Sequence, residues 1–341
     1  MSEAAPLLEA NGLKCHFDVS APLLNRLLEH QPRQVVRAVD GVSFRIDKGT
    51  TFGLVGESGC GKSTLARLVV GLYRPNAGAI RFEGVDLAAG TARTGSKSPQ
   101  ARMQMIFQNP YASLNPRWRV ADIIAEPLRF RNLVHGRAAV SARVAELLRQ
   151  VGLSPADAQR YPHEFSGGQR QRISIARALA GEPDFLVCDE PTSALDVSVQ
   201  AQILNLMKDL QRRLGLTYLF ISHNLAVVYH VSDTVGVMYL GRLVEWADTE
   251  SLFRRPQHPY TRMLLDAIPD LAMTGHPRTP VAGEVPSPLD PPPGCAFHPR
   301  CPFANARCRS EVPQDTKLPG GAVACHAVAE GRLPAWKEYG A

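Results

Sequence analysis

Short apolar runs recur along the chain and are separated by stretches with helical spacing. Four of these runs read TFGLV, QMIF, DFLVCD and TYLFIS, at residues 51–55, 104–107, 184–189 and 217–222. Continuous apolar runs of this length, bounded by turns, are typical of strands that are buried on both faces of a parallel sheet. The pattern therefore predicts an α/β fold, with a mainly parallel sheet that is covered by helices on both faces.

Other segments follow different periods. Residues 77–87, AGAIRFEGVDL, alternate between glycine turns and predict an antiparallel element. Residues 141–153 and 200–216 have helical periodicity, and a glycine near the C-terminal end of each stretch is a stop signal. Proline and glycine become frequent near the C-terminus, where four of the seven cysteines cluster. We therefore expect a main domain over residues 1–270 and a small appended domain over residues 271–341.

Composition narrows the possible classes of protein. The 341 residues are 45% hydrophobic and 21% charged, which is ordinary for a folded chain and argues against global disorder. The net charge of +6 comes without a dense run of lysine and arginine, so a nucleic-acid surface is not favoured. No apolar stretch reaches the roughly 18 residues that span a bilayer, and the first residues lack the pattern of a signal peptide. We expect a cytosolic chain with reduced cysteines.

The first chemical motif, GESGCGKST, lies between an apolar run and a helical stretch. Its G-x-x-x-x-G-K-S pattern fits a phosphate-binding P-loop, in which glycines let the backbone wrap around phosphate oxygens. Backbone amides and the start of the following helix then face the anion. The lysine is expected to neutralise the β and γ phosphates, and the serine after it to coordinate Mg²⁺. The expected nucleotide-binding residues are Gly56, Ser58, Gly59, Cys60, Gly61, Lys62, Ser63 and Thr64.

Two acidic residues stand at the end of the run DFLVCD: Asp189 is its last residue, and Glu190 follows directly. Asp189 is expected to hold the Mg²⁺ site, and Glu190 to polarise an attacking water as a general base. Acidic residues commonly end strands, so this pair gains its meaning from the P-loop.

A serine, two glycines and a glutamine open the stretch SGGQRQRISIARALAG. Ser166 and Gln169 fit an S-x-x-Q capping box, which is a structural role. The adjacent Gly167 and Gly168 would weaken a first helical turn unless something must approach the backbone closely. The same residues therefore also fit a second phosphate clamp at a helix N-terminus.

Taken together, these motifs resemble the ATP-binding subunits of ABC transporters, with FSGGQ as the family signature. Gln108 resembles the Q-loop glutamine, which joins the Mg²⁺ site to a helical subdomain, here about residues 109–182. Asp196 in SALD resembles the D-loop aspartate, and His223 resembles the switch histidine that contacts the γ-phosphate. Phe17 is our candidate for the aromatic residue that stacks on adenine.

The resemblance implies a P-loop NTPase core of the ABC type, with antiparallel β and α-helical subdomains beside a mixed, mainly parallel sheet. It also implies that the signature of one subunit covers the ATP held by the P-loop of another. Two ATP molecules would close the dimer, and hydrolysis would open it and move membrane subunits. A groove near the Q-loop and residues 111–120 is the expected contact with those subunits.

Three further segments, FQNPYASLNPR, HPYTRMLLDAIP and GEVPSPLDPPPGCAFHPRCPFA, resemble the dipeptide/oligopeptide branch of ABC importers. Within it, the chain looks most like the second ATPase subunit of a dipeptide permease. This implies that the chain lies peripherally on the cytoplasmic side of a bacterial inner membrane and drives the import of short peptides. The implied partners are two transmembrane permease subunits, a second ATPase subunit and an extracytoplasmic peptide-binding protein, without nucleic acid.

The C-terminal cysteines are candidate metal ligands, spaced C-x₅-C-x₆-C-x₁₆-C at Cys295, Cys301, Cys308 and Cys325. Four thiolates can hold an iron–sulfur cluster or a structural zinc ion, and the absence of C-x₂-C pairs favours the cluster. The resemblance implies [4Fe–4S], while zinc and four unliganded thiols remain alternatives. The other cysteines, Cys15, Cys60 and Cys188, are interpreted as structural.

Two alternative functions belong to other classes of ABC protein. A soluble ABC ATPase that acts on nucleic acid or ribosomes typically has tandem ATPase cores or a long coiled coil. This sequence has one P-loop, one signature and no sustained heptad pattern. An exporter half would carry fused membrane helices.

Overall fold

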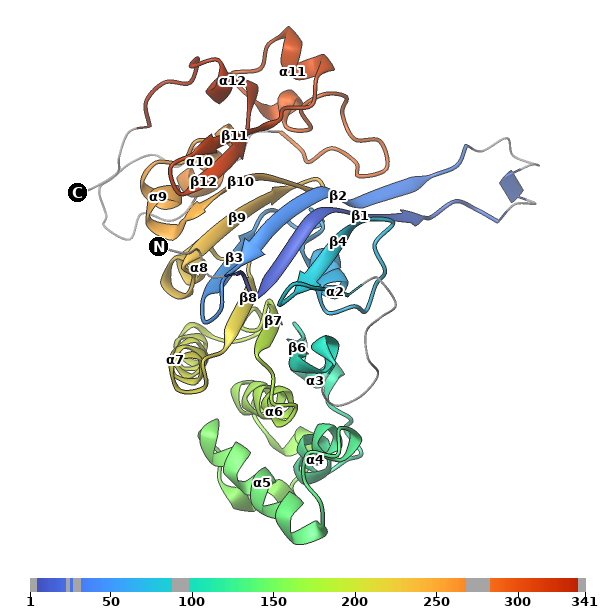
Figure 1. Ribbon diagram of the computed structural model, residues 1–341, viewed down its shortest axis with the longest axis vertical. Coiled ribbons are helices and arrows are strands. Elements are labelled where there is room, and N and C mark those ends of the chain that lie inside the picture. Colours follow the sequence, from blue (N-terminus) through green and yellow to red (C-terminus); the bar gives the residue numbers. More distant parts are fainter. Residues whose placement is uncertain (1–4, 23–24, 27–31, 88–97, 268–282, 337–341) are drawn as a thin grey trace.

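A mixed sheet forms the centre of the protein (Figure 1). The computed structural model describes residues 5–22, 25–26, 32–87, 98–267 and 283–336. Within them the main sheet has the order β11-β12-β10-β9-β3-β8-β7-β6. Neighbours from β9 to β6 pair in parallel, and β10, β12 and β11 continue the sheet by antiparallel pairing. The strands are β3 (Thr51–Val55), β6 (Met103–Ile106), β7 (Phe185–Asp189), β8 (Thr217–Ile221), β9 (Thr234–Tyr239), β10 (Arg242–Asp248), β11 (Asp315–Leu318) and β12 (Gly321–Ala324).

The four apolar runs of the sequence form β3, β6, β7 and β8, which confirms the predicted parallel sheet. All residues of β3, β7 and β8 are buried. Such strands lie in the middle of the sheet, where both faces are covered, and so they need continuous apolar side chains.

A second sheet covers one end of the core. It has the order β2-β1-β4-β5 and consists of β1 (Leu8–Asp18), β2 (Val35–Ile46), β4 (Ala77–Phe82) and β5 (Val85–Asp86). The antiparallel element predicted from residues 77–87 is β4 with β5. Helix α2 (Lys62–Val69) shares one apolar cluster with both sheets. The ends of β1 and β2 project from the body as a long arm (Figure 1).

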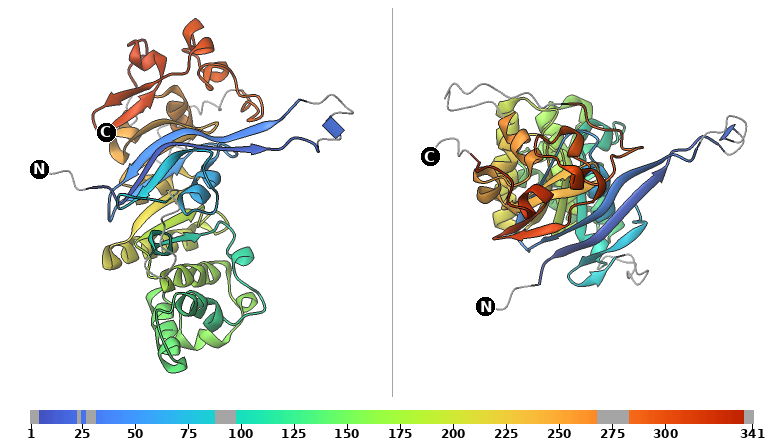
Figure 2. Two further views of the ribbon diagram at one scale, coloured as in Figure 1. Left: turned by 45° about the vertical axis from the view of Figure 1, so that its right-hand side comes forward. Right: turned by 90° about the horizontal axis from the view of Figure 1, so that it is seen from above.

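Helices between residues 110 and 180 form a separate layer at the end of the molecule opposite the C-terminal region (Figure 1, Figure 2). They lie within the range expected for a helical subdomain. The α-helices are α3 (Pro110–Ser113), α4 (Val120–Phe130), α5 (Arg137–Gln150) and α6 (Gly167–Ala180).

Both helices predicted from periodicity are present. Helix α5 covers most of the stretch predicted at 141–153, and α7 (Val197–Leu214) covers most of 200–216. The capping glycine of α7 is Gly215, with φ of 65°. This left-handed conformation ends the helix as the sequence predicts.

The C-terminal region, which we define as the chain from α9 (Thr249–Arg254) onward and which therefore begins before the predicted boundary at residue 270, is joined to the main sheet. Strand β12 pairs with β10 through Glu245 and Val323, Trp246 and Ala322, and Ala247 and Gly321. Its α-helices are α9 (Thr249–Arg254), α10 (Pro259–Asp266), α11 (Ala306–Ser310) and α12 (His326–Ala329), and a 3₁₀ helix, η4, spans His298–Arg300. The predicted boundary between residues 270 and 271 lies outside the described residues.

No helix in the described ranges has the length and apolar character that a bilayer span requires.

Candidate functional site

The loop between β3 and α2 has a fixed shape. Gly61 has φ of 105°, and a Cβ atom there would lie 2.0 Å from the carbonyl oxygen of Ala38. Glycine is required because other residues are strained at this φ and would clash with backbone. The buried ammonium of Lys62 donates to the carbonyl oxygens of Gly56 and Glu57, at 2.8 and 2.9 Å. The lysine thus holds the loop that the sequence assigns to phosphate binding.

The two acidic residues at the end of β7 lie beside this loop. Ser63 Oγ donates to Asp189 Oδ1 at 3.0 Å. Burial raises the pKa of the Asp189 carboxyl, the hydrogen bond from Ser63 opposes this, and the charge of Glu190 adds to it. Glu190 itself has φ of 48°, and its amide donates to the carbonyl oxygen of Ile221 at 3.0 Å. Non-glycine residues in this conformation are uncommon and concentrate at functional sites.

The predicted catalytic residues meet at one carboxylate oxygen. Gln108 Nε2 donates to Glu190 Oε2 at 3.0 Å, and His223 Nδ1 lies 3.1 Å from the same oxygen. The three residues follow β6, β7 and β8, and the carboxyl ends of parallel strands meet at one edge of the sheet. The structure therefore brings together residues that are far apart in the sequence.

The signature segment forms a capping box at the start of α6. The backbone amide of Gln169 donates to Ser166 Oγ at 3.4 Å, and the backbone amide of Ser166 donates to Gln169 Oε1 at 3.0 Å. A Cβ atom on Gly168 would lie 2.4 Å from Val199 Cγ1 in α7, whereas one on Gly167 would make an ordinary 3.4 Å contact. Packing of α6 against α7 is therefore one close approach that requires glycine at position 168. Phosphate binding by this segment stays a prediction.

The proposed D-loop aspartate begins α7. Asp196 Oδ1 accepts the amide of Val199 at 2.9 Å and the hydroxyl of Ser198 at 2.8 Å. These hydrogen bonds lower the pKa of the Asp196 carboxyl. The same turn places Val199 against the signature, so the two motifs are packed together.

Phe17 lies near the end of β1 and packs edge-on against Tyr73, with ring centroids 5.4 Å apart. It pairs with Val36 in β2, two residues before Ala38, whose carbonyl oxygen faces Gly61. Its role in stacking on adenine stays a prediction.

The four C-terminal cysteines lie near one another. The Cys295 amide donates to the Cys308 carbonyl oxygen at 2.9 Å. Burial raises the pKa of the Cys295 thiol to about 11 and that of Cys301 to about 12, and neighbouring cysteines add to both shifts. Burial also raises the pKa of Cys325. Even so, among the described residues no three His, Cys, Asp or Glu side chains are arranged to hold a metal ion, so the geometry does not support a cluster.

Two functional candidates, Tyr260 and Arg300, were not marked as site residues by the sequence. Arg300 pairs with the carboxylate of Glu57 in the P-loop, and Tyr260 accepts the Glu57 amide. Tyr260 and Arg300 belong to the segments HPYTRML and HPRCP, but neither segment's spacing indicates a contact with a loop about 200 residues earlier.

Two family profiles match the chain. The profile described as "ABC transporter" matches residues 39–193, and "Oligopeptide/dipeptide transporter, C-terminal region" matches residues 244–308. The first match contains the P-loop, the signature and both acidic residues. The second begins within β10 and includes Tyr260 and Arg300.

Similar proteins match nearly the whole chain. Di/tripeptide transport ATP-binding protein DppF of Pseudomonas aeruginosa is 50% identical over 94% of this chain and 97% of its own length. Dipeptide transport ATP-binding protein DppF of Escherichia coli is 47% identical over 96% of each chain. Oligopeptide transport ATP-binding protein AppF of Bacillus subtilis is 48% identical over 94% of this chain and 97% of its own.

Solved structures confirm the predicted core fold. The chain of cbiO1 from Clostridium perfringens, part of the ABC transporter complex cbiONQ, has a TM-score of 0.59 and 25% identity. That match covers 73% of this chain and 90% of cbiO1. The ATP-binding cassette MJ0796, in a post-hydrolysis dimer bound to ADP and Pi, has a TM-score of 0.60 at 22% identity, over 71% and 98% of the two chains.

The packing at Gly168 gives a testable prediction. Gly168→Ala should lower the free energy of unfolding by about 1–3 kcal/mol, because the new methyl group overlaps Val199. Val199→Ala in the same chain should restore most of the loss. Urea unfolding of the two single variants and the double variant measures the coupling. Additive effects would contradict the packing explanation.

Proposed function

Because the chain belongs to the ABC transporter ATPases, in the branch with the oligopeptide/dipeptide C-terminal region, we propose that it hydrolyses ATP to drive the import of di- or oligopeptides. The observation that carries this proposal is the meeting of Gln108 and His223 on Glu190, beside the loop held by Lys62. The peptide cargo is supported by the names of the relatives and by the match to the C-terminal region. Nothing in those names favours the nucleic-acid alternative.

The P-loop would bind the triphosphate. Lys62 sits at the start of α2, so its ammonium and the first amides of the helix meet the negative charge together. Ser63, Asp189 and Gln108 would hold Mg²⁺, because a hydroxyl, a carboxylate and an amide oxygen are the hard donors that this ion prefers. When bound, Mg²⁺ neutralises charge on the β and γ phosphates.

Glu190 would act as the general base. Its Oε2 is held between Gln108 and His223, which fixes the carboxylate where it can take a proton from an attacking water. The His223 side chain is 61% exposed, so this chain alone leaves that side of the site open to solvent. We propose that a second ATPase subunit closes it with its own signature, and that Ser166, Gly167, Gly168 and Gln169 do the same for the partner. The partner is expected to be a different chain.

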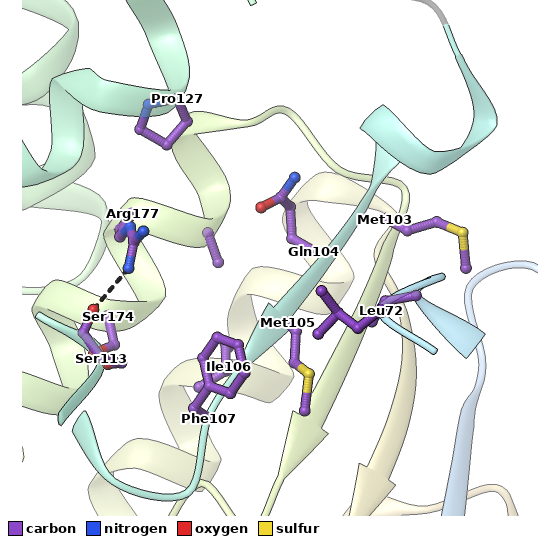
Figure 3. Close-up of a pocket in the computed structure, with 12 residues that line it drawn as sticks. Leu72, Met103, Gln104, Met105, Ile106, Phe107, Ser113, Pro127, Ser174 and Arg177 are labelled. Atoms are coloured by element: carbon purple, nitrogen blue, oxygen red, sulfur yellow. Dashed lines mark hydrogen bonds between the residues drawn. The ribbon is translucent and has the colours of Figure 1, made fainter. Parts of the chain in front are cut away.

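Transport requires contact with membrane permease subunits, and a groove beside the Q-loop is the proposed place. Figure 3 shows it between β6 and the helical layer, with Leu72, Met105 and Phe107 on one side and Pro127 and Arg177 on the other. Apolar side chains with a few polar groups suit the insertion of a partner helix. The chain would then lie peripherally on the cytoplasmic face of the membrane, with an extracytoplasmic protein delivering the peptide.

The four C-terminal cysteines are proposed to bind a [4Fe–4S] cluster, with zinc as the alternative. The proposal is supported by four thiols in one small region, of which Cys308 and Cys325 are buried and Cys295 and Cys301 half-buried, although the described geometry is not that of a ligand set. Small regions of this size commonly need such a cross-link for stability.

Replacement of the proposed base should separate binding from turnover. Glu190→Gln should lower kcat about 10²–10⁴-fold while ATP binding persists, because the P-loop is intact. Mixed with the partner ATPase subunit, the variant should also be trapped by ATP in a dimer that size-exclusion chromatography detects. Glu146→Gln, an exposed change in α5, is the matched control. Turnover by Glu190→Gln at the control rate would remove Glu190 as the base.

The groove can be tested with an exposed side chain. Leu72 is 58% exposed, so Leu72→Gln should leave the fold intact, together with the basal ATPase activity of the chain paired with its partner ATPase subunit. Co-purification with the permease and ATP-dependent uptake of peptides in vesicles should fall at least about threefold, as apolar contact area is lost. Leu214→Gln, at a 46% exposed position on α7, should change neither. Equal effects of the two changes would exclude the groove.

The proposed cluster predicts the colour and the metal content of the purified protein. Protein purified without oxygen should be brown and contain about four iron atoms per chain if it binds one [4Fe–4S] cluster. Cys308→Ser should bleach the absorbance and lower the iron content. A colourless protein with one zinc ion per chain would support the alternative, and a metal-free protein would support unliganded thiols.

A further inference from the structure

A carboxylate lies inside the phosphate-binding loop. Glu57 directly follows Gly56, and its side chain is 22% exposed. Its carbonyl oxygen accepts a hydrogen bond from the Lys62 ammonium at 2.9 Å. A negative charge this close to a bound triphosphate repels it, and partial burial strengthens the repulsion. The loop therefore needs a cation that neutralises Glu57.

Arg300 supplies that cation from the C-terminal region. Its Nη1 donates to Glu57 Oε2 at 2.7 Å and its Nη2 to Oε1 at 3.0 Å. The Arg300 side chain is 2% exposed. A two-point pair between a planar guanidinium and a carboxylate fixes orientation as well as charge. The direction of the Glu57 side chain is thus set by a residue 243 positions away.

Tyr260 holds the backbone of the same residue. The Glu57 amide donates to Tyr260 Oη at 2.8 Å, and Tyr260 is fully buried. The amide and carboxylate of Glu57 are therefore both held by the C-terminal region, and its carbonyl oxygen is held by Lys62.

An aromatic cluster fixes the positions of Arg300 and Tyr260. The ring centroid of Tyr239 lies 4.7 Å from that of Tyr260 and 5.3 Å from that of Phe297, and the centroids of Tyr260 and Phe297 are 5.4 Å apart. The guanidinium carbon of Arg300 lies 5.8 Å from the Tyr239 ring and 5.9 Å from the Phe297 ring. These rings come from β9, α10 and the turn before η4, so the cluster joins the core sheet to the C-terminal region.

Buried polar groups hold the start of α10. The amides of Gln257 and His258 donate to the Glu245 carboxylate at 2.7 and 2.8 Å. His258 Nδ1 accepts the amide of Tyr260 at 3.0 Å. Burial lowers the pKa of His258 to about 3, so the imidazole stays neutral and keeps its acceptor. The Tyr260 hydroxyl therefore has a fixed position.

We infer that Arg300 and Tyr260 are positioning residues for nucleotide binding, which neutralise and fix Glu57 so that the P-loop accepts a nucleoside triphosphate. The inference rests on the nucleotide site proposed above. It makes the C-terminal region part of that site through the contacts of Arg300 and Tyr260 with Glu57.

The test compares ATP binding by the purified full-length chain with ATP turnover by that chain assembled with its partner ATPase subunit. Arg300→Gln should weaken ATP affinity about tenfold and leave kcat at saturating ATP within about twofold, because the change acts on binding rather than on the base. The loss should shrink at high salt, where charge repulsion is screened. A merely structural role of Arg300 would not produce this salt dependence.

A double variant tests the charge directly. Glu57→Gln combined with Arg300→Gln removes both charges and keeps groups that can hydrogen bond. Affinity should return to within about threefold of the wild type, as repulsion is the main loss. Arg309→Gln changes an exposed arginine of the same region and should leave affinity unchanged.

The outcomes separate this inference from the proposed function. A folded Arg300→Gln chain with wild-type affinity would overturn the inference, and so would a stable double variant that fails to recover. If Arg300→Gln does not fold, Tyr260→Phe replaces it as the test. That variant removes only the hydroxyl and should weaken affinity several-fold, and wild-type affinity would again overturn the inference. A wild-type chain that binds ATP no better than Lys62→Ala would overturn the proposed function and this inference with it.

Discussion

The site depends on the hydrogen bonds from the Lys62 ammonium to the carbonyl oxygens of Gly56 and Glu57. These bonds close the loop between β3 and α2 upon itself, and Gly61 lets the chain pass against the carbonyl oxygen of Ala38 as it enters the helix. A buried ammonium needs such acceptors. The loop therefore takes the shape that gives the Lys62 ammonium its hydrogen-bond acceptors. The same positive charge can then attract a phosphate.

Helix α6 links the signature segment to the groove beside the Q-loop. Its first residues form the signature, with Ser166 as N-cap, and its last turns contribute Ser174 and Arg177 to the groove shown in Figure 3. Arg177 Nη1 donates to the Ser113 carbonyl oxygen at 2.8 Å, which fastens the helix to the segment after the Q-loop. Because a helix moves as a rigid element, a shift of the signature toward a bound nucleotide also moves the groove wall.

The sequence predicted the parts whose signals are local. Apolar runs identified β3, β6, β7 and β8. The structure brings together the motif residues that follow β6, β7 and β8, because parallel strands share one edge. The antiparallel extension by β11 and β12 was not foreseen, since DTKL and GAVA are short and carry no clear alternation. The contact that requires glycine at position 168 could not be read from the sequence, because the neighbour, Val199, lies in another helix.

The contact between Arg300 and Glu57 shows most clearly what local patterns omit. Neither residue is unusual where it stands, and their pairing follows from the sheet, which carries β10 beside β9 and so brings the C-terminal region to the P-loop. A buried ion pair contributes little net stability, because desolvation offsets most of the attraction. Its greater effect is on geometry, since a guanidinium without its carboxylate would be left in an apolar cluster. The pair therefore favours one arrangement of the loop, and binding to a loop already in that arrangement avoids the cost of ordering it.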